Sequence, residues 1–350
     1  MVMPSGPTEM RGGRGRAVVV LGATPSVVDT MDFFETASTG NATDFGNASV
    51  ARYQNGFGGM ASGTRGVFQG GASPSVNIME YVTISSSGGA NDFGDHHRGV
   101  TNGNGQCANG TRGLLAGGYL APVFYNTIDF ITIATTGGTS DFGEFDDGST
   151  GGYSPMASPT RAVFARAGQN INFINFTSGG KTQIFGDMRG DSRDGHIASC
   201  SNSTRGIMAG GEAPSRVNTI TFITLATLGN PQDFGDLTAV RNDQDAVASQ
   251  TRGFVVAGST GSVTNLIDFV TIASTGNASD FGDLIASTGQ AGGATCNATR
   301  ALWGGSYNVT IGYITMATTG NALDFGDAVN AWGHRPVSYT HLTLPTKRIV

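Results

Sequence analysis

The stretch "NLIDFVTIASTGNASDFGDL", residues 265–284, decides the fold, because closely similar words return along the chain. Its triplet Asp280-Phe281-Gly282 is one of seven copies, with Phe-to-Phe steps of 43 to 49 residues and Ile184 in place of the aspartate in the fourth copy. In a protein kinase the same triplet occurs once and acts with a glycine-rich loop and a catalytic loop. Neither loop is present in this sequence. Seven copies at one place in a repeat indicate a structural role, in which the phenylalanines fill a layer between repeats, as we expect for Phe93, Phe142, Phe234 and Phe281.

Two further positions recur in every unit. An arginine stands in a Thr-Arg-Gly word or a close variant, and an aromatic residue lies 12 positions before each triplet phenylalanine. The arginines are Arg16, Arg65, Arg112, Arg161, Arg205, Arg252 and Arg300, and the aromatic residues are Phe33, Tyr81, Phe130, Phe173, Phe222, Phe269 and Tyr313. We predict that the repeated arginines are structural too, and that the triplet aspartates accept hydrogen bonds from a turn or from these arginines.

The run around each aromatic residue reads as a strand that is buried on both faces. In "NTIDFITIAT", residues 126–135, alternation points Ile128 and Phe130 one way and Ile131 and Ile133 the other. In an antiparallel sheet this pattern requires a second sheet on each face. A repeat of this length with several strands is typical of a propeller blade. We therefore predict an all-β protein, a seven-bladed β-propeller of four-stranded antiparallel blades. An open solenoid of stacked β units is the alternative.

The fifth unit shows where the four strands should lie. We expect the first strand at 196–202, the second at 205–211, the third at 218–227 and the fourth at 232–237. The small residues of the first strand suit the crowded position nearest the axis. Cys107, Cys200 and Cys296 fall on first strands of separate units, so we expect them to be small core residues and not a disulfide framework or a metal cluster.

Composition supports this class and argues against others. The chain of 350 residues holds 55 glycines, and its only lysines are Lys181 and Lys347. A net charge of −6 without a basic stripe argues against a nucleic-acid partner. We find no apolar run long enough for a membrane span and no apolar core of a signal peptide. We therefore expect cytoplasmic synthesis without membrane insertion.

The repeat resembles a kelch-type propeller over about residues 14–330. The shared features are a glycine pair after the second strand, as at Gly210-Gly211, an aromatic residue in the third strand and a bulky aromatic residue in the fourth. The chain departs from that pattern because its fourth strand carries Phe where kelch units carry Trp, and because the first, fourth and sixth units keep a single glycine. We assign residues 14–336 to one seven-repeat propeller and residues 1–13 to an N-terminal arm or part of blade 1.

The last residues break the repeat. Residues 337–350, "VSYTHLTLPTKRIV", resemble a translated sequencing-library adapter, so we expect a non-native tail there. The first unit begins near its second strand. We expect its innermost strand either from residues before Arg14 or from residues 329–334.

One rim of the ring is expected to carry the variable loops. Four-stranded blades place the connections between second and third strands, and those between blades, on the same rim, which we call the variable rim. Loops that vary on a rigid scaffold are where ligands bind. Tyr119, Phe124 and Tyr125 can form a stacking surface for a sugar there, or can simply cover the end of the blade. His96 and His97, beside Asp95, are further binding candidates.

Carboxylates gather on consecutive loops of the same rim. Glu144, Asp146, Asp147, Asp191 and Asp194 offer oxygen ligands of the kind that Ca²⁺ prefers. They match no calcium-loop pattern, so solvated loop charge is the alternative. Apart from Ca²⁺ we expect no cofactor.

Two functions remain open at this point. The first is a non-enzymatic binding or structural module that binds a surface glycan or protein. Its specific form is a virion or tail-fibre protein, because the Gly/Thr/Asn-rich repeats resemble proteins encoded by phages from aquatic samples. The second is a carbohydrate-active or oxidase-type enzyme on a kelch-like propeller. No known catalytic motif can be assembled from the residues, which favours the first, while the oligomeric state and the ligand stay open.

Overall fold

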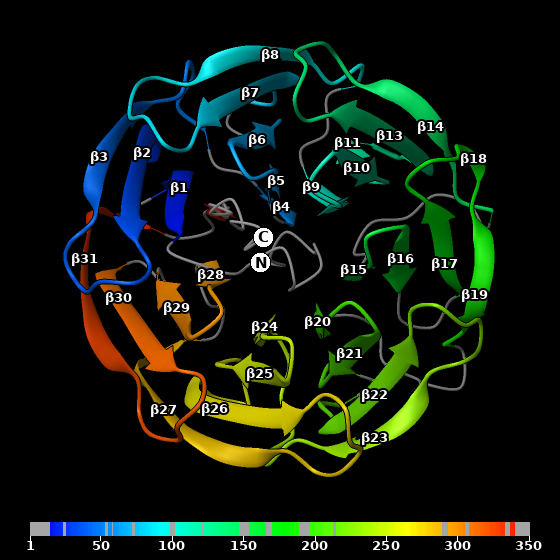
Figure 1. Cartoon of the computed structure of the whole chain (residues 1–350), viewed down its shortest axis with the longest axis vertical. Helices are drawn as coiled ribbons and strands as arrows, with labels where there is room; N and C mark the ends of the chain where they lie inside the picture. The colour runs from blue at the N-terminus through cyan, green and yellow to red at the C-terminus, as the bar shows by residue number, and fades with distance from the viewer. Residues whose placement is uncertain are drawn as a thin grey trace, which may run out of the picture.

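The computed structural model describes residues 15–23, 26–52, 55–57, 59–71, 74–98, 102–120, 122–146, 154–165, 170–188, 197–212, 215–288, 293–304, 308–332 and 337–339. In these ranges the chain forms strands and no helix, and the strands build seven sheets around a common axis (Figure 1). The predicted all-β, seven-bladed propeller is confirmed. None of the described residues forms a helix long and apolar enough to cross a bilayer.

Each blade is an antiparallel sheet whose main strands follow one another outward from the axis. Blade 1 comprises β32 (Val337–Tyr339), β1 (Arg16–Ala23), β2 (Val27–Glu35) and β3 (Thr43–Asn47); blade 2, β5 (Met60–Ala61), β6 (Arg65–Gln69), β7 (Ile78–Thr83) and β8 (Asn91–Asp95); blade 3, β9 (Asn102–Ala108), β10 (Arg112–Ala116), β13 (Thr127–Thr132) and β14 (Ser140–Glu144); blade 4, β15 (Ser154–Ala157), β16 (Arg161–Ala165), β17 (Asn170–Asn175) and β19 (Gln183–Asp187). Blade 5 comprises β20 (Ala198–Ser201), β21 (Arg205–Ala209), β22 (Thr219–Thr224) and β23 (Gln232–Asp236); blade 6, β24 (Asp245–Ala248), β25 (Arg252–Val256), β26 (Thr264–Thr271) and β27 (Ser279–Thr288); blade 7, β28 (Gly293–Cys296), β29 (Arg300–Gly304), β30 (Asn308–Thr315) and β31 (Leu323–Trp332). The four strands expected in the fifth unit are thus present.

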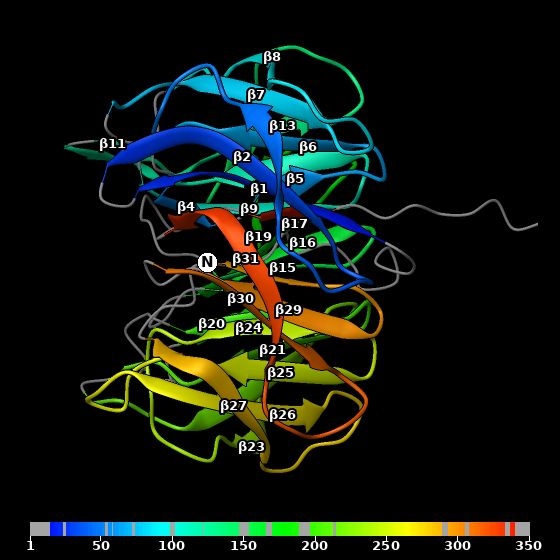
Figure 2. The same cartoon turned by 90° about the vertical axis from the view of Figure 1, so that its left-hand side faces the viewer.

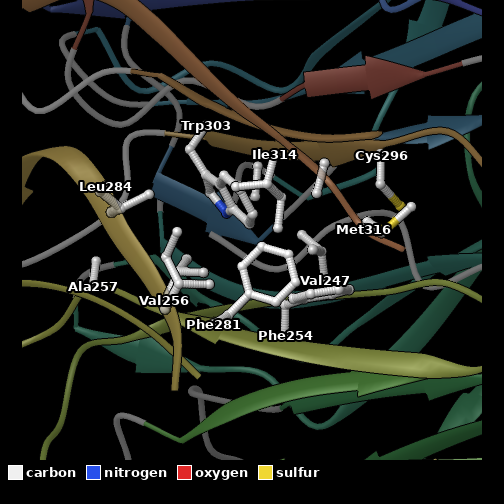
Figure 3. Close-up of a cluster of buried hydrophobic side chains, with 13 residues drawn as sticks. Val247, Phe254, Val256, Ala257, Phe281, Leu284, Cys296, Trp303, Ile314 and Met316 are labelled. Atoms are coloured by element: carbon white, nitrogen blue, oxygen red, sulfur yellow. The ribbon is translucent and has the colours of Figure 1, made fainter. Parts of the chain in front are cut away.

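The core consists of seven apolar clusters, and each cluster joins two neighbouring blades. Ile128 and the half-buried Phe130 pack toward blade 4, whereas Ile131 and Ile133 pack toward blade 2, as the alternation in their strand predicts. Figure 3 shows the cluster between blades 6 and 7, in which Phe281 of the triplet lies among Phe254, Val256 and Ile314. The seventh cluster joins blade 7 to blade 1, so the ring is closed and the solenoid alternative is wrong.

In six of the seven units the repeated arginine links its blade to the next. In all seven units the guanidinium lies over the third-strand aromatic ring of its own blade, at 4.2 to 5.0 Å from the ring centroid. In six units the same side chain also donates to a backbone carbonyl of the following blade, as Arg205 does to Ile272 at 2.8 Å and Arg252 to Met316 at 2.7 Å. The arginine thus shields an aromatic face and bridges two sheets, and none of these contacts involves the triplet aspartate.

The triplets form a second link at the outer edge of the ring. The phenylalanine is buried in every copy, with at most 6% of its surface exposed. In five copies the aspartate accepts a hydrogen bond from the amide of its own triplet glycine, as Asp280 does from Gly282 at 3.0 Å. That glycine touches the turn of the next blade, and the turn amide donates back, as Gly320 N does to Phe281 O at 2.8 Å. The triplet is therefore an interblade clamp.

The ring closes between β31 and β3 by the same clamp. Gly40 N donates to Phe325 O at 2.7 Å, and Ala42 N donates to Asp327 O at 2.7 Å. The innermost strand of blade 1 is β32, whose three residues pair with Ala17, Val18 and Val19. Residues 337–339, which the sequence analysis had set aside, thus lie against β1. Of residues 329–334, which it had considered for this position, residues 329–332 continue β31 on the outside of blade 7, and residues 333 and 334 lie outside the described residues.

Candidate functional site

The variable rim departs most from the repeat at blade 3. There β11 (Tyr119–Leu120) and β12 (Val123–Phe124) form an extra hairpin that is attached to β9. β4 (Asn55–Phe57), from the connection between blades 1 and 2, pairs with β9 in parallel. No other blade gains strands on this rim among the described residues. Because the repeat shows what the ring itself requires, we look for the functional site at these additions.

The hairpin holds an aromatic pair, in which Phe124 is exposed and Tyr119 is half-buried. Tyr119 and Phe124 are cross-strand partners whose ring centroids lie 4.5 Å apart, with an angle of 38° between the rings. Phe124 is 50% exposed and Val123 is 47% exposed. Figure 2 shows β11 at the left edge of the molecule, beyond the body of the blades. The hairpin therefore offers an aromatic surface away from the core, where the sequence predicted a stacking surface.

Tyr125 is placed differently from Phe124. Its amide donates to Gly118 O at 2.8 Å, which continues the hairpin by one residue. Successive residues of a strand point to opposite faces, so Tyr125 lies on the face opposite to Phe124. Its ring meets the guanidinium of Arg98 at 5.3 Å from the ring centroid. The sequence brought the three aromatic residues together, and the structure divides them between two faces.

His96 and His97 belong to a polar cluster behind the hairpin. Their rings are stacked, and both contact the buried carboxylate of Asp129, His96 by Nε2 at 3.1 Å and His97 by Nδ1 at 3.3 Å. His96 is itself buried, with its Nδ1 against the backbone carbonyl oxygen of Arg98. Only His97 reaches the surface. The pKa of His97 is lowered, mainly because burial disfavours the charged ring, while Asp129 opposes the shift.

The predicted calcium ligands are only partly described. Glu144 and Asp146 both lie near Lys181, at 3.4 and 4.0 Å from its Nζ. Asp147, Asp191 and Asp194 lie outside the described residues. Within the described ranges no group of three or more His, Cys, Asp or Glu side chains could hold a metal ion. The Ca²⁺ site stays a prediction.

A further set of polar residues was missed by the sequence analysis. The residue just before the third-strand aromatic is a buried carboxylate in four blades, and in three of these it contacts an arginine or histidine of the preceding interblade loop. Glu80 pairs with Arg52 at 2.6 Å, and Asp268 pairs with Arg241 at 3.0 Å. The signal was visible, since an acid in the middle of an otherwise apolar strand needs a partner. These pairs fix interblade loops of the variable rim to the blades.

Asp245 is a buried carboxylate of another kind. It opens β24, its Oδ1 accepts from Ala246 N at 2.9 Å, and its Oδ2 has no hydrogen-bond partner. Burial raises its pKa to about 6, above the usual 3.8. The folded protein therefore binds this proton more tightly than the unfolded chain does, and stability falls as pH rises from about 4 through about 6.

We expect Asp245→Asn to stabilise the fold above pH 7, by on the order of 2 kcal/mol, because the amide keeps the contact with Ala246 and removes the buried charge. At pH 4 the variant and the wild type should be equally stable. Urea unfolding followed by circular dichroism at pH 4 and pH 8 checks this. An equal gain at pH 4 and pH 8 would show that the carboxylate charge is not the cause.

Comparisons with known proteins add no family to this description. No protein-family model matches the chain, and no curated protein matches it.

Proposed function

We propose that the protein is a non-enzymatic binding or structural module that holds a surface glycan or protein at the β11–β12 hairpin. The observation that carries the proposal is the exposed ring of Phe124, which lies against the half-buried ring of Tyr119. The pair stands on the hairpin that the variable rim adds to blade 3 within the described ranges. A ring built from seven similar units needs no such hairpin for its stability, so the exposure of Phe124 is explained by an external contact.

The pair has the properties of a contact surface. Aromatic rings offer a large apolar area with few rotatable bonds, so little conformational entropy is lost on binding. The apolar C–H face of a pyranose can lie on the exposed ring of Phe124, and an apolar side chain of a protein can do the same. The rings are held by the cross-strand pairing of Tyr119 with Phe124 and of Leu120 with Val123. The surface is therefore formed before a ligand arrives.

The finer assignments form part of the same proposal. We place the ring in the kelch-type class because of the glycine pairs and the third-strand and fourth-strand aromatic residues. We propose a virion or tail-fibre protein as the specific form, which is supported by the composition and by the similarity of the repeats to one another.

Phe124→Ala is expected to weaken binding about tenfold or more, because truncating a central aromatic contact removes 1 to 2 kcal/mol or more, by the order of magnitude known for binding hot spots. The full chain is tested on a glycan array and against surface proteins of cells that it binds, and the affinity of each retained ligand is measured by biolayer interferometry. The control is Val263→Ala, an apolar residue that is 57% exposed on the second-to-third-strand connection of blade 6.

Two results would contradict the proposal. Equal affinities of Phe124→Ala and the wild type for every retained ligand would remove the hairpin from the binding site. Turnover of a retained glycan would show that the protein is an enzyme.

A further inference from the structure

The contact between Arg98 and His97 fixes the protonation of the histidine. Arg98 Nε donates to His97 Nε2 at 2.6 Å. Because a guanidinium has no acceptor and stays charged, Nε2 must be unprotonated. The ring proton is therefore on Nδ1, which lies 3.0 Å from Thr139 Oγ1 and 3.3 Å from Asp129 Oδ1. This arrangement exists only while His97 is neutral.

Arg98 joins this cluster to the hairpin. Its guanidinium faces the ring of Tyr125, on the side of the hairpin away from Phe124. A cation that lies over an aromatic ring is attracted by the negative charge of the ring face. Nη2 of Arg98 is 3.9 Å from Asp129 Oδ1, so the charge is also attracted inward. Arg98 therefore supports the hairpin from behind, and His97 holds Arg98 in place.

Protonation of His97 would break this support. A proton on Nε2 would face the N–H of Arg98, so that two donors and two positive charges meet. The charged and titratable groups that act on His97 are Asp129 on β13, Asp141 on β14, and Arg98 and His96 on its own loop. The protonated ring of His97 would be attracted to the carboxylate of Asp129. There it would compete with Arg98 for the same oxygen atoms.

We propose that His97 is a pH-sensitive positioning residue, which in its neutral form holds Arg98 against Tyr125 and so keeps the β11–β12 hairpin in its binding position. The proposal deepens the proposed function, on which its consequence for ligand binding rests. The consequence for the hairpin itself does not depend on any ligand.

The direction of the effect follows from the local environment. Burial lowers the pKa of His97 below 6.5. The folded state therefore binds this proton less readily than an open state, and the neutral contact is lost as the pH falls through a value below 6.5. The hairpin should be ordered at pH 7.5 and loosened at pH 5.

Hydrogen exchange of the full chain tests this without a ligand. We measure the protection of the peptide that spans residues 117–126 by mass spectrometry at pH 7.5 and pH 5, after correction for intrinsic exchange rates. In the wild type we expect protection to fall about three- to tenfold at pH 5. His97→Gln, whose side-chain oxygen can accept from Arg98 but does not titrate, should keep the protection of the wild type at pH 7.5 at both values. Arg98→Gln should show the low protection at both.

The controls separate this effect from general unfolding. The third strand of blade 6, residues 264–271, reports on the ring and should lose no protection at pH 5. Equal protection of the hairpin in the wild type at both pH values would overturn the proposal, as would a pH effect that persists in His97→Gln.

Binding to the glycans and surface proteins retained in the array and cell-surface tests gives the second readout. If the hairpin loosens at pH 5 and a retained ligand is lost at pH 5 by the wild type but not by His97→Gln, both proposals are supported. If the hairpin loosens but nothing is retained at pH 7.5, the proposed function fails and the role of His97 stands. A ligand that is bound equally at both pH values by the wild type overturns the control of binding by His97.

Discussion

Gly282→Ala is expected to destabilise the ring by about 3 to 5 kcal/mol, because a methyl group must fit into an interblade contact that leaves it no space. A Cβ on Gly282 would lie 2.6 Å from the backbone carbon and oxygen of Gly320 in blade 7, and 2.8 Å from Asn321 N. The clash is with backbone, so no side-chain rotation relieves it. The φ angle of +141° adds strain for any residue with a side chain. Urea unfolding measures the loss.

Gly320→Ala is the matched control at the same interface. Gly320 has a similar φ of +154°, but a Cβ there would meet nothing within 4 Å. The control therefore carries the backbone strain alone, about 1 to 2 kcal/mol. The difference between the two losses of unfolding free energy measures the cost of the steric clash between the Cβ at residue 282 and the backbone of Gly320. Equal losses would mean that the triplet glycine is needed only for its backbone angle.

The clamp also explains which part of the sequence analysis succeeded. A repeat marks the residues that every interface needs. Phe281 is buried between blades, and its six counterparts are buried in the same way. The first and sixth units form blades although each lacks one glycine of the pair. Leu21 and Ala257 adopt there the left-handed φ of 60° and 59° that Gly70 and Gly210 have in complete units. Such a conformation costs about 1 to 2 kcal/mol in a residue other than glycine. The fold tolerates that cost in blades 1 and 6.

Other features could not be predicted, because they depend on contacts between units. The spacing of the triplets along the chain does not predict which turn of the next blade the triplet glycine contacts. The sequence placed Tyr119, Phe124 and Tyr125 in one loop, but only the pairing of Tyr119 with Phe124 shows that Tyr125 faces Arg98 instead. The pairing of Arg52 with Glu80 could not be predicted for the same reason, since the two residues lie 28 positions apart in the sequence.

The second large effect is expected at the pair formed by Arg52 and Glu80. Both side chains are buried, at 0% and 2% exposure, and their charged atoms lie 2.6 Å apart. Arg52 also donates to Gly70 O at 2.7 Å and to Val50 O at 3.0 Å, and Glu80 accepts from Ser49 N at 2.7 Å. The pair therefore holds the connection between blades 1 and 2 against the ring. Removing one charge leaves the other buried without compensation.

We expect Glu80→Gln to cost about 3 to 5 kcal/mol of the free energy of unfolding, whereas the same substitution at the surface pair of Arg16 and Glu35, Glu35→Gln, should cost about 0 to 1 kcal/mol. Glu35 is 45% exposed, so water screens its interaction with Arg16. The double variant Arg52→Met with Glu80→Gln should lose less than the sum of the two single losses, because no lone buried charge remains. Urea unfolding of the four proteins in this cycle measures the coupling. Additive losses would show that the two charges act independently, and that the loop is held by its contacts with the backbone alone.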